Sequence, residues 1–266
     1  MNQMTEAMFE LAGMDELARR TSPMHALHPL PKLLTALLYI GTILSFPNTR
    51  LTGLVSMVLF PVIGYAAARI PVRTCFYKLR YVLPLVAAVG IFNPILNRAP
   101  AFTLGALTVS EGMISFLALL LKGTLSLMAS FLLVATTGIE KLCYALRLLR
   151  VPKILVTTLL ITYRYISLLL QEAGTMTNAY RLRAPGQRGI HISAWGSFLG
   201  QLLLRSMDRA GELYHSMQMR GFTGSFYYAG TLKASPRDYA FLPLCAALIL
   251  LFRLVNIPVL LGSLFV

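Results

Sequence analysis

Two short segments of the chain place an arginine beside a small residue. The first reads AYRLRA and contains Ala179, Arg183 and Ala184; the second reads SMQMRGF and contains Ser216, Met219, Arg220 and Gly221. In each, a small residue is followed by three others, then by an arginine and a second small residue. A small neighbour lets a helix tip enter a groove, where the planar guanidinium can form two hydrogen bonds with a carboxylate. The predicted chemistry is docking onto an acidic groove of a partner.

Each segment taken alone also has a purely structural explanation. An arginine in the last turn of a helix complements the helix macrodipole, and a glycine at the next position is a common C-cap. Two such segments lie in one basic region, and each closes a long predicted helix. Their pairing favours docking over capping alone.

Other patterns that could support chemistry are weak. The sequence has no G-x-x-x-x-G-K-[ST] phosphate loop, no H-E-x-x-H and no nucleophile elbow. We therefore predict no catalytic residue, no cofactor and no enzyme activity, and assign any ATP hydrolysis to another chain. His25 and His28 are spaced i, i+3 and could be metal ligands on one helical face. We favour the alternative of two interfacial histidines beside a proline-rich turn.

Two basic residues lie inside apolar runs, where a charge is costly. Lys122 is about eight residues into the run at 114–136. We expect it to face a helical bundle and to pair with a carbonyl or a polar side chain, and its role stays open. Arg164 lies in the middle of residues 154–170 and is a second candidate for a bundle-internal charge.

The composition indicates a bilayer as the main solvent. Of 266 residues, 56% are hydrophobic and 13% are charged, about half the charged fraction of a typical soluble domain. The net charge of +14 could suggest nucleic acid. However, the basic residues alternate with long apolar runs, as in cytoplasmic membrane loops. Three widely separated cysteines form neither a disulfide framework nor a zinc spacing.

Five apolar runs predict five membrane spans in an all-α polytopic protein. They cover about 33–46, 51–70, 81–97, 114–136 and 239–265. Lys and Arg gather before the first run and between the second and third, whereas the first hairpin and residues 98–113 hold one arginine each. By the positive-inside rule, the N-terminus is cytoplasmic and the C-terminus lies outside. One domain, 1–266, then consists of a cytoplasmic segment 1–32, four spans at 33–138, a cytoplasmic region 139–238 and a last span at 239–266.

The region 139–238 is the most unusual part, because it holds 13 of the 24 Lys and Arg residues. Pro152 opens a helical pattern that extends to Arg183. A second, amphipathic helix is predicted from Ser193 to Arg220. Residues 154–170 could pass for a sixth span, but the central Arg164 and the basic residues after it favour a partly buried cytoplasmic helix.

In the residues described above, the chain resembles the transmembrane T component (EcfT/CbiQ family) of energy-coupling factor (ECF) transporters. Residues 219–224 (MRGFTG) resemble the second coupling motif, and residues 179–184 the first, with Ala184 in place of the usual glycine. It is closest to the cobalt and nickel branch, CbiQ, because of residues 15–18 (DELA), 22–32 (SPMHALHPLPK), 150–153 (RVPK) and 162–165 (TYRY).

The resemblance implies a non-enzymatic coupling subunit in the plasma membrane of a prokaryote. Its partners would be two ABC-type ATPases and a substrate-binding integral membrane subunit within the lipid bilayer, with no nucleic acid. Arg183 and Arg220 would dock in grooves of the two ATPases, and the two cytoplasmic coupling helices would transmit ATPase closure. The substrate, cobalt, nickel or a vitamin, would be recognised elsewhere. The alternative is an ordinary ABC importer permease with its own substrate path; a membrane enzyme or channel is a third class.

Overall fold

The computed structural model describes residues 12–47, 51–96, 100–104, 107–187, 189–224 and 235–254. The chain divides into two compact units, which are described separately. The first unit comprises residues 1–16 and 139–231, and the second comprises residues 17–138 and 232–266. The first thus contains most of the region predicted to hold the coupling helices, and the second contains the predicted spans.

The second unit is built of helices and one short hairpin. Its elements are α2 (Pro23–Ala26), α3 (Pro29–Leu44), α4 (Leu51–Met57), α5 (Leu59–Ala68), α6 (Val72–Gly90), α7 (Phe92–Leu96), β1 (Pro100–Leu104), β2 (Leu107–Ser110), α8 (Glu111–Thr137) and α12 (Pro236–Leu254). Each of the five predicted runs contains a helix. The antiparallel pair β1–β2 was not predicted and departs from a purely helical fold.

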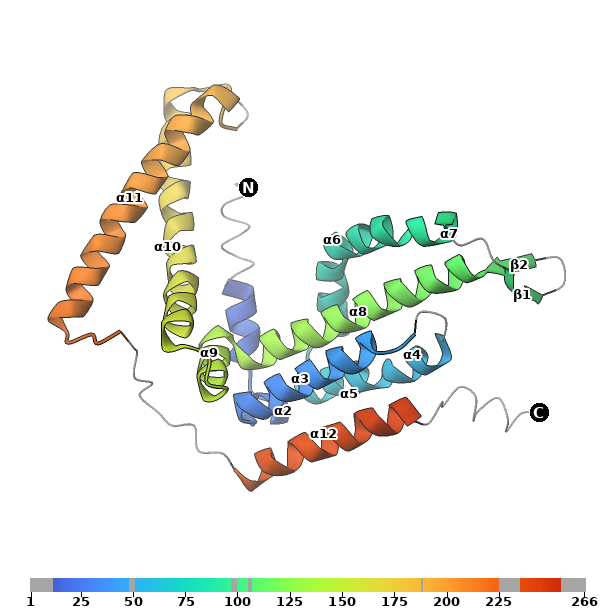
Figure 1. Ribbon diagram of the computed structural model, residues 1–266. Helices are drawn as coiled ribbons and strands as arrows, with labels where there is room; N and C mark the ends of the chain where they lie inside the picture. Colours follow the sequence, from blue (N-terminus) through green and yellow to red (C-terminus); the bar gives the residue numbers. More distant parts are fainter. Residues whose placement is uncertain are drawn as a thin grey trace. The chain divides into compact units, whose positions relative to one another are not determined.

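Helix α8 is the central element of this unit and packs along α3 and α6 (Figure 1). Two buried tyrosines fix neighbouring helices through main-chain carbonyls. The Tyr39 hydroxyl donates to the Met57 oxygen at 2.8 Å, and the Tyr65 hydroxyl donates to the Met128 oxygen at 3.0 Å. At Gly64 a Cβ would approach Leu132 to 2.5 Å, so glycine permits the close contact between α5 and α8.

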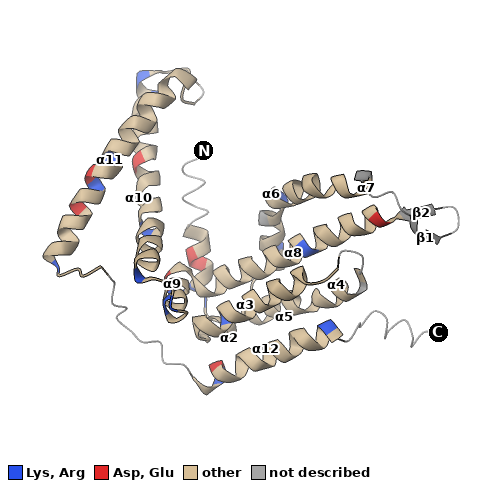
Figure 2. Ribbon diagram, in the orientation of Figure 1, with Lys and Arg blue, Asp and Glu red and all other residues tan. Residues whose placement is uncertain are grey.

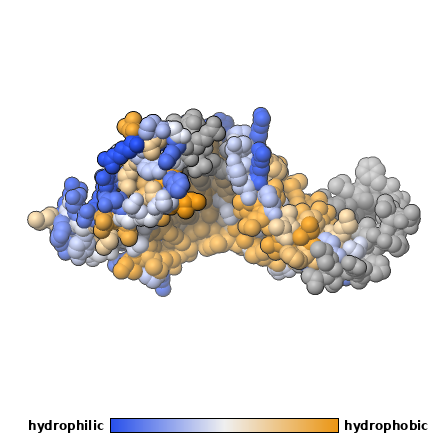
Figure 3. Space-filling view, turned by 90° about the horizontal axis from the view of Figure 1, so that it is seen from above, coloured by the Kyte–Doolittle hydropathy of each residue, from blue (hydrophilic) through white to orange (hydrophobic). Residues whose placement is uncertain are grey.

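The second unit buries several polar side chains beside its apolar core and exposes many apolar ones. Its buried residues include His25, Lys32, Lys122 and Asp238. Large apolar side chains are exposed along its helices, among them Leu85, Val89, Phe92 and Leu244 at 60% or more. Figure 3 shows hydrophobic residues over much of the visible surface. This distribution fits a lipid environment, in which exposed apolar side chains cost nothing and polar groups must find partners inside.

The buried carboxylate of Asp238 joins the start of α12 to the start of α3. One oxygen accepts from the His28 main-chain N–H at 2.8 Å, and the other accepts from the Ser235 N–H at 2.7 Å. The second contact is the reverse bond of a capping box, in which an acidic residue in the first turn satisfies the N–H that precedes the helix. Sequence analysis did not find the link between α12 and α3, because Asp238 and His28 are 210 residues apart in the chain.

The first unit contains α9 (Ile139–Leu148), α10 (Lys153–Arg183) and α11 (Ile192–Met219). Figure 2 shows charged residues of both signs along α10 and α11. By length and composition, α8 and α10 are the two helices of the described chain that could each cross a membrane. The cytoplasmic position of α10 and the number of spans therefore stay predictions.

Candidate docking site at two helix ends

The first predicted motif closes α10 with a proline-directed turn. Ala184 has φ −125° and ψ 67°, a non-helical conformation that agrees with the exclusion of the helical region before a proline. Gly186 has φ +97°, and the Gln187 N–H donates to the Ala184 oxygen at 3.3 Å. Proline followed by a glycine of positive φ forms a type II turn. Alanine is therefore acceptable at position 184, because the position that requires glycine falls at Gly186.

Tyr180 fastens the loop beyond this turn to the last turn of α10. Its hydroxyl donates to Gln187 Oε1 at 2.8 Å and accepts from the His191 main-chain N–H at 3.4 Å. His191 in turn caps α11, with its side chain accepting from the Ser193 N–H. These contacts link Gln187 and His191 to the last turn of α10, close to Arg183.

The second motif closes α11 with a Schellman turn. The Phe222 N–H donates to the Met217 oxygen at 3.0 Å, and the Gly221 N–H donates to the Gln218 oxygen at 2.9 Å. Gly221 has φ +75°, the left-handed conformation that favours glycine at this position. The glycine C-cap, which sequence analysis gave as the structural explanation of this segment, is thus present. The two segments are alike in residue types, but only the second closes its helix in this way.

The two helix ends expose the same kinds of side chain. Leu182 and Met219 are large apolar side chains that are 84% and 91% exposed, and each directly precedes an arginine. Arg183 and Arg220 are themselves exposed, as are Ala179 and Ser216 one turn earlier. Among the described residues, neither arginine forms an ion pair. Each end therefore offers a guanidinium beside an apolar side chain, a combination suited to a groove with a carboxylate and an apolar wall.

The helices α10 and α11 run in opposite directions, so the two motifs lie far apart (Figure 1). Arg183 is near the start of α11 and Arg220 is at its end. The 28 residues of α11 span about 42 Å at 1.5 Å per residue. A single groove could not hold both arginines.

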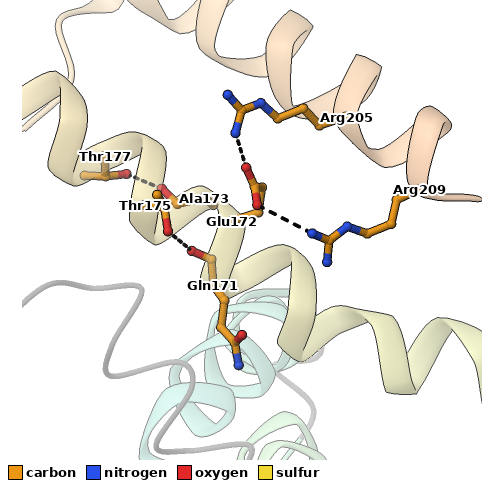
Figure 4. A network of polar contacts seen from close by, with 7 residues as sticks. All are labelled: Gln171, Glu172, Ala173, Thr175, Thr177, Arg205 and Arg209. Carbon is orange, nitrogen blue, oxygen red and sulfur yellow. Dashed lines mark hydrogen bonds and ion pairs between the residues drawn. The ribbon is translucent and has the colours of Figure 1, made fainter.

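Glu172 links the two helices between these ends (Figure 4). Its carboxylate forms ion pairs with Arg205 and, at 3.9 Å, with Arg209. The arginines are one helical turn apart and line an open groove of about 390 Å³ beside Glu172. Sequence analysis predicted the second helix, which contains Arg205, but did not find the partner of this arginine. A usable signal existed, because Glu172 is the one acidic residue of α10.

Reversing this charge tests whether Glu172 holds the helices together. We expect Glu172→Arg to place three cations in contact and to lengthen and broaden the distance distribution between spin labels at Thr175 and Met207. Because the pair is partly exposed, the neutral variant Glu172→Gln should cost only about 0.2–1 kcal/mol. Asp208→Arg, a charge reversal in the same groove, should move the distribution far less. An unchanged distribution in Glu172→Arg would rule out the link.

The amphipathic face predicted for the second helix is divided in the structure. Phe198 is buried, and Leu202, Leu213 and Met217 are half-buried. Beside them runs an exposed apolar stripe, made up of Trp195, Leu199, Leu203, Met207 and Tyr214, whose members are 42–63% exposed. Half of the predicted apolar face thus stays uncovered in the chain on its own.

Comparison with known proteins assigns the chain that carries these two helix ends to a family. The family called CbiQ and described as "Cobalt transport protein" matches residues 20–228, which include both helix ends and the Glu172 link. The chain belongs to the CbiQ family. It is thus a component of a membrane transport system.

Individual relatives of this CbiQ-family chain agree with that assignment. The cobalt transport protein CbiQ of Rhodobacter capsulatus is 30% identical over 73% of this chain and 77% of its own length. The nickel permease LarQ of Lactiplantibacillus plantarum is 32% identical over 39% of this chain and 38% of its own. An uncharacterised protein of Methanocaldococcus jannaschii is 27% identical over 50% of this chain and 46% of its own.

Two of the CbiQ-like stretches of the sequence meet in the first unit. The Tyr163 hydroxyl donates to Asp15 Oδ1 at 2.7 Å. Tyr163 lies in the stretch 162–165 of α10, and Asp15 lies in the stretch 15–18 near the N-terminus. The bond joins the N-terminal segment to the helix that ends in Arg183.

Of the two charges predicted inside a bundle, one is found there. Lys122 is 7% exposed, and its Nζ donates to the Phe46 oxygen at 2.6 Å, so the predicted pairing with a carbonyl is confirmed. Arg164 is exposed on α10. A bundle-internal position for Arg164 stays a prediction, because its side chain is exposed in the chain on its own.

The histidine pair has structural contacts. His25 is buried; its Nε2 bonds the Leu17 oxygen at 2.9 Å and its Nδ1 bonds Ser22 Oγ at 2.7 Å. His28 Nδ1 accepts from the Leu30 N–H at the start of α3. Within the described residues no group of three His, Cys, Asp or Glu side chains could hold a metal. These contacts fit the interpretation of two histidines beside a proline-rich turn.

The left-handed glycine of the second end gives a direct test of how Arg220 is positioned. A Cβ at Gly221 would meet no atom within 4 Å, so the cost of Gly221→Val is conformational, about 1–2 kcal/mol. We expect the last turn of α11 to fray, with amide hydrogen exchange at 220–222 faster by about tenfold. Ala184→Gly, at a position with negative φ, should leave exchange at its own helix end nearly unchanged. Equal exchange in wild type and Gly221→Val would contradict the assigned role.

Proposed function

We propose that this CbiQ-family chain is the non-enzymatic transmembrane coupling subunit of an ATP-driven, ECF-type uptake transporter. The observation that supports this best is the pair of exposed arginines, each beside an exposed apolar residue, at helix ends about 42 Å apart along α11. Two separate ATPase subunits would each receive one end, in a groove that holds a carboxylate for the guanidinium.

The apolar stripe of α11 is proposed to contact the substrate-binding integral membrane subunit. Trp195, Leu203 and Met207 are each more than 40% exposed, and large aromatic and sulfur-containing side chains of this kind are enriched in protein interfaces. With α10 and α11 joined at Glu172, a displacement of either end by an ATPase would move the stripe. Closure of the ATPases would thereby tilt the substrate-binding subunit.

The proposed substrate is a cobalt or nickel ion. This proposal rests on the family description and on the relatives from Rhodobacter and Lactiplantibacillus. We assign recognition of the ion to the substrate-binding subunit, as the sequence resemblance implies. We propose no metal site in this chain.

The proposed location is the plasma membrane of a prokaryote, with five spans, a cytoplasmic N-terminus and an external C-terminus. The distribution of Lys and Arg supports this orientation. It places residues 139–238, with both arginine ends, on the side of the membrane where ATP is available.

The second candidate is a permease subunit of an ordinary ABC importer with its own substrate path. Such a subunit usually engages its ATPase through one coupling helix, and the two motifs here favour the first function. Co-purification of the tagged chain with its genomic neighbours distinguishes the two. We expect a pair of ATPases and a separate membrane-embedded substrate subunit to accompany it. Recovery of ATPases alone, with substrate transport intact, would support the permease.

A further inference from the structure

The exposed face of α6 changes character along its length. The residues of α6 on this face recur every three or four positions: Arg73, Phe76, Tyr77, Arg80, Tyr81, Pro84, Leu85, Ala88 and Val89 are all exposed. The opposite face contains the buried Cys75 and Leu79 and packs against α8. Up to Tyr81 the exposed face is basic and aromatic, and beyond it the face is entirely apolar.

The first three turns have the composition of a membrane interface. Phe76, Tyr77 and Tyr81 are 52%, 60% and 70% exposed, and the two tyrosine rings meet edge to face with centroids 6.4 Å apart. Tyrosines concentrate at the level of lipid headgroups, where the ring is in contact with apolar chains and the hydroxyl with water. Among the described residues, Arg73 and Arg80 form no ion pair.

The charge of this segment selects the kind of occupant. Two exposed arginines on one face, with no acidic residue anywhere in α6, complement an anionic surface. From Arg73 to Tyr81 the helix rises about 12 Å, and from Tyr81 to Val89 another 12 Å. The first distance is enough to cover the headgroup region, and the second reaches well into the hydrocarbon. A soluble acidic partner could not also cover the apolar half.

We propose that Arg73, Phe76, Tyr77, Arg80 and Tyr81 form a binding surface for anionic phospholipid headgroups, which fixes the depth of α6 in the membrane. The arginines pair with headgroup phosphates, the aromatic rings lie at the level of the acyl-chain carbonyls, and Leu85 and Val89 contact the acyl chains. This function is independent of ATPase docking, since it involves neither arginine motif.

A tryptophan reporter can test the surface directly. The chain has one tryptophan, so Trp195→Phe with Phe76→Trp gives a single reporter on the proposed binding surface of α6. The full chain is placed in nanodiscs of phosphatidylcholine. A lipid that is brominated near the carbonyl end of its acyl chains, and so quenches tryptophan fluorescence, is then added. This lipid is either phosphatidylglycerol or phosphatidylcholine. We expect phosphatidylglycerol to occupy the reporter site about fivefold more strongly at low salt, and the preference to vanish in high salt.

Variants of the two arginines separate charge from fold. Arg73→Gln with Arg80→Gln should abolish the preference for phosphatidylglycerol, whereas Arg73→Lys with Arg80→Lys should keep it even if stability changes. Arg181→Gln, an exposed arginine of α10, is the matched control and should have no effect. Equal quenching by both lipids with the arginines intact would overturn the proposal. Quenching by neither lipid in the folded chain would also overturn it, because the α6 surface would then face protein or water.

Discussion

Reversing the charge at both helix ends, Arg183→Glu with Arg220→Glu, is expected to release the ATPase subunits and abolish uptake while the protein stays in the membrane. Each reversal would place a carboxylate against the carboxylate proposed for the partner groove. Loss of one hydrogen-bonded charge pair at an interface costs about 2–5 kcal/mol. Each end should therefore lose at least about thirtyfold in affinity, and both together should leave no measurable assembly.

The controls for this experiment are close in sequence. Arg181→Glu makes the same charge change two residues before Arg183, also at an exposed position of α10, and should preserve assembly. Arg183→Lys with Arg220→Lys keeps the charge but removes the planar fork, so intermediate binding is expected. Assembly is measured by pull-down of the ATPases, and uptake by accumulation of the metal ion. Normal assembly and uptake in the double Glu variant would refute the docking role.

Removing the buried carboxylate in Asp238→Ala is expected to be the most destabilising single change outside the two helix ends. Asp238 is 6% exposed and accepts two main-chain N–H bonds, from His28 and Ser235. The variant leaves both N–H groups without this acceptor, and hydrogen bonds to a charged group are worth about 1.5–3 kcal/mol each. We expect a loss of about 2–4 kcal/mol, with a thermal midpoint roughly 5–10 °C lower.

Two further variants separate the effect of losing the carboxylate from the effect of losing side-chain volume. Asp238→Asn keeps one acceptor oxygen at nearly the same size and should lose about half as much. Tyr239→Ala, at a neighbouring residue that is 73% exposed, should change the midpoint little. Both are followed by thermal unfolding in nanodiscs. A midpoint in Asp238→Ala equal to that of wild type would show that α12 is held by its apolar contacts alone.

Features set by local chemistry could be predicted from the sequence. A lysine within an apolar run must find a partner, and Lys122 was correctly expected to meet a carbonyl. The glycine after Arg220 fits a helix C-cap by its residue type alone, and the structure has that cap. The first end closes differently, because Pro185 directly follows Ala184. That proline moves the left-handed position two residues along the chain, to Gly186.

Features set by tertiary packing could not be predicted. Glu172 meets Arg205 across 33 positions of sequence, and Asp238 meets His28 across 210. No local periodicity encodes either pairing. The split of the α11 apolar face likewise depends on where α10 packs. Arg164 illustrates the reverse case, since its place in an apolar run suggested burial but its side chain is exposed.

Site-directed crosslinking tests the central claim most directly. A photoreactive residue is placed at Leu182 or at Met219, the exposed apolar neighbours of the two arginines, and the complex is irradiated in native membranes. We expect an ATPase adduct from each of these two positions, with one helix end on each ATPase subunit. A photoreactive residue at Leu199, on the α11 stripe, should form no ATPase adduct and should react with the substrate-binding subunit. Adducts with lipid alone, or ATPase adducts from only one of the two ends, would contradict the proposal of a subunit that couples two ATPases.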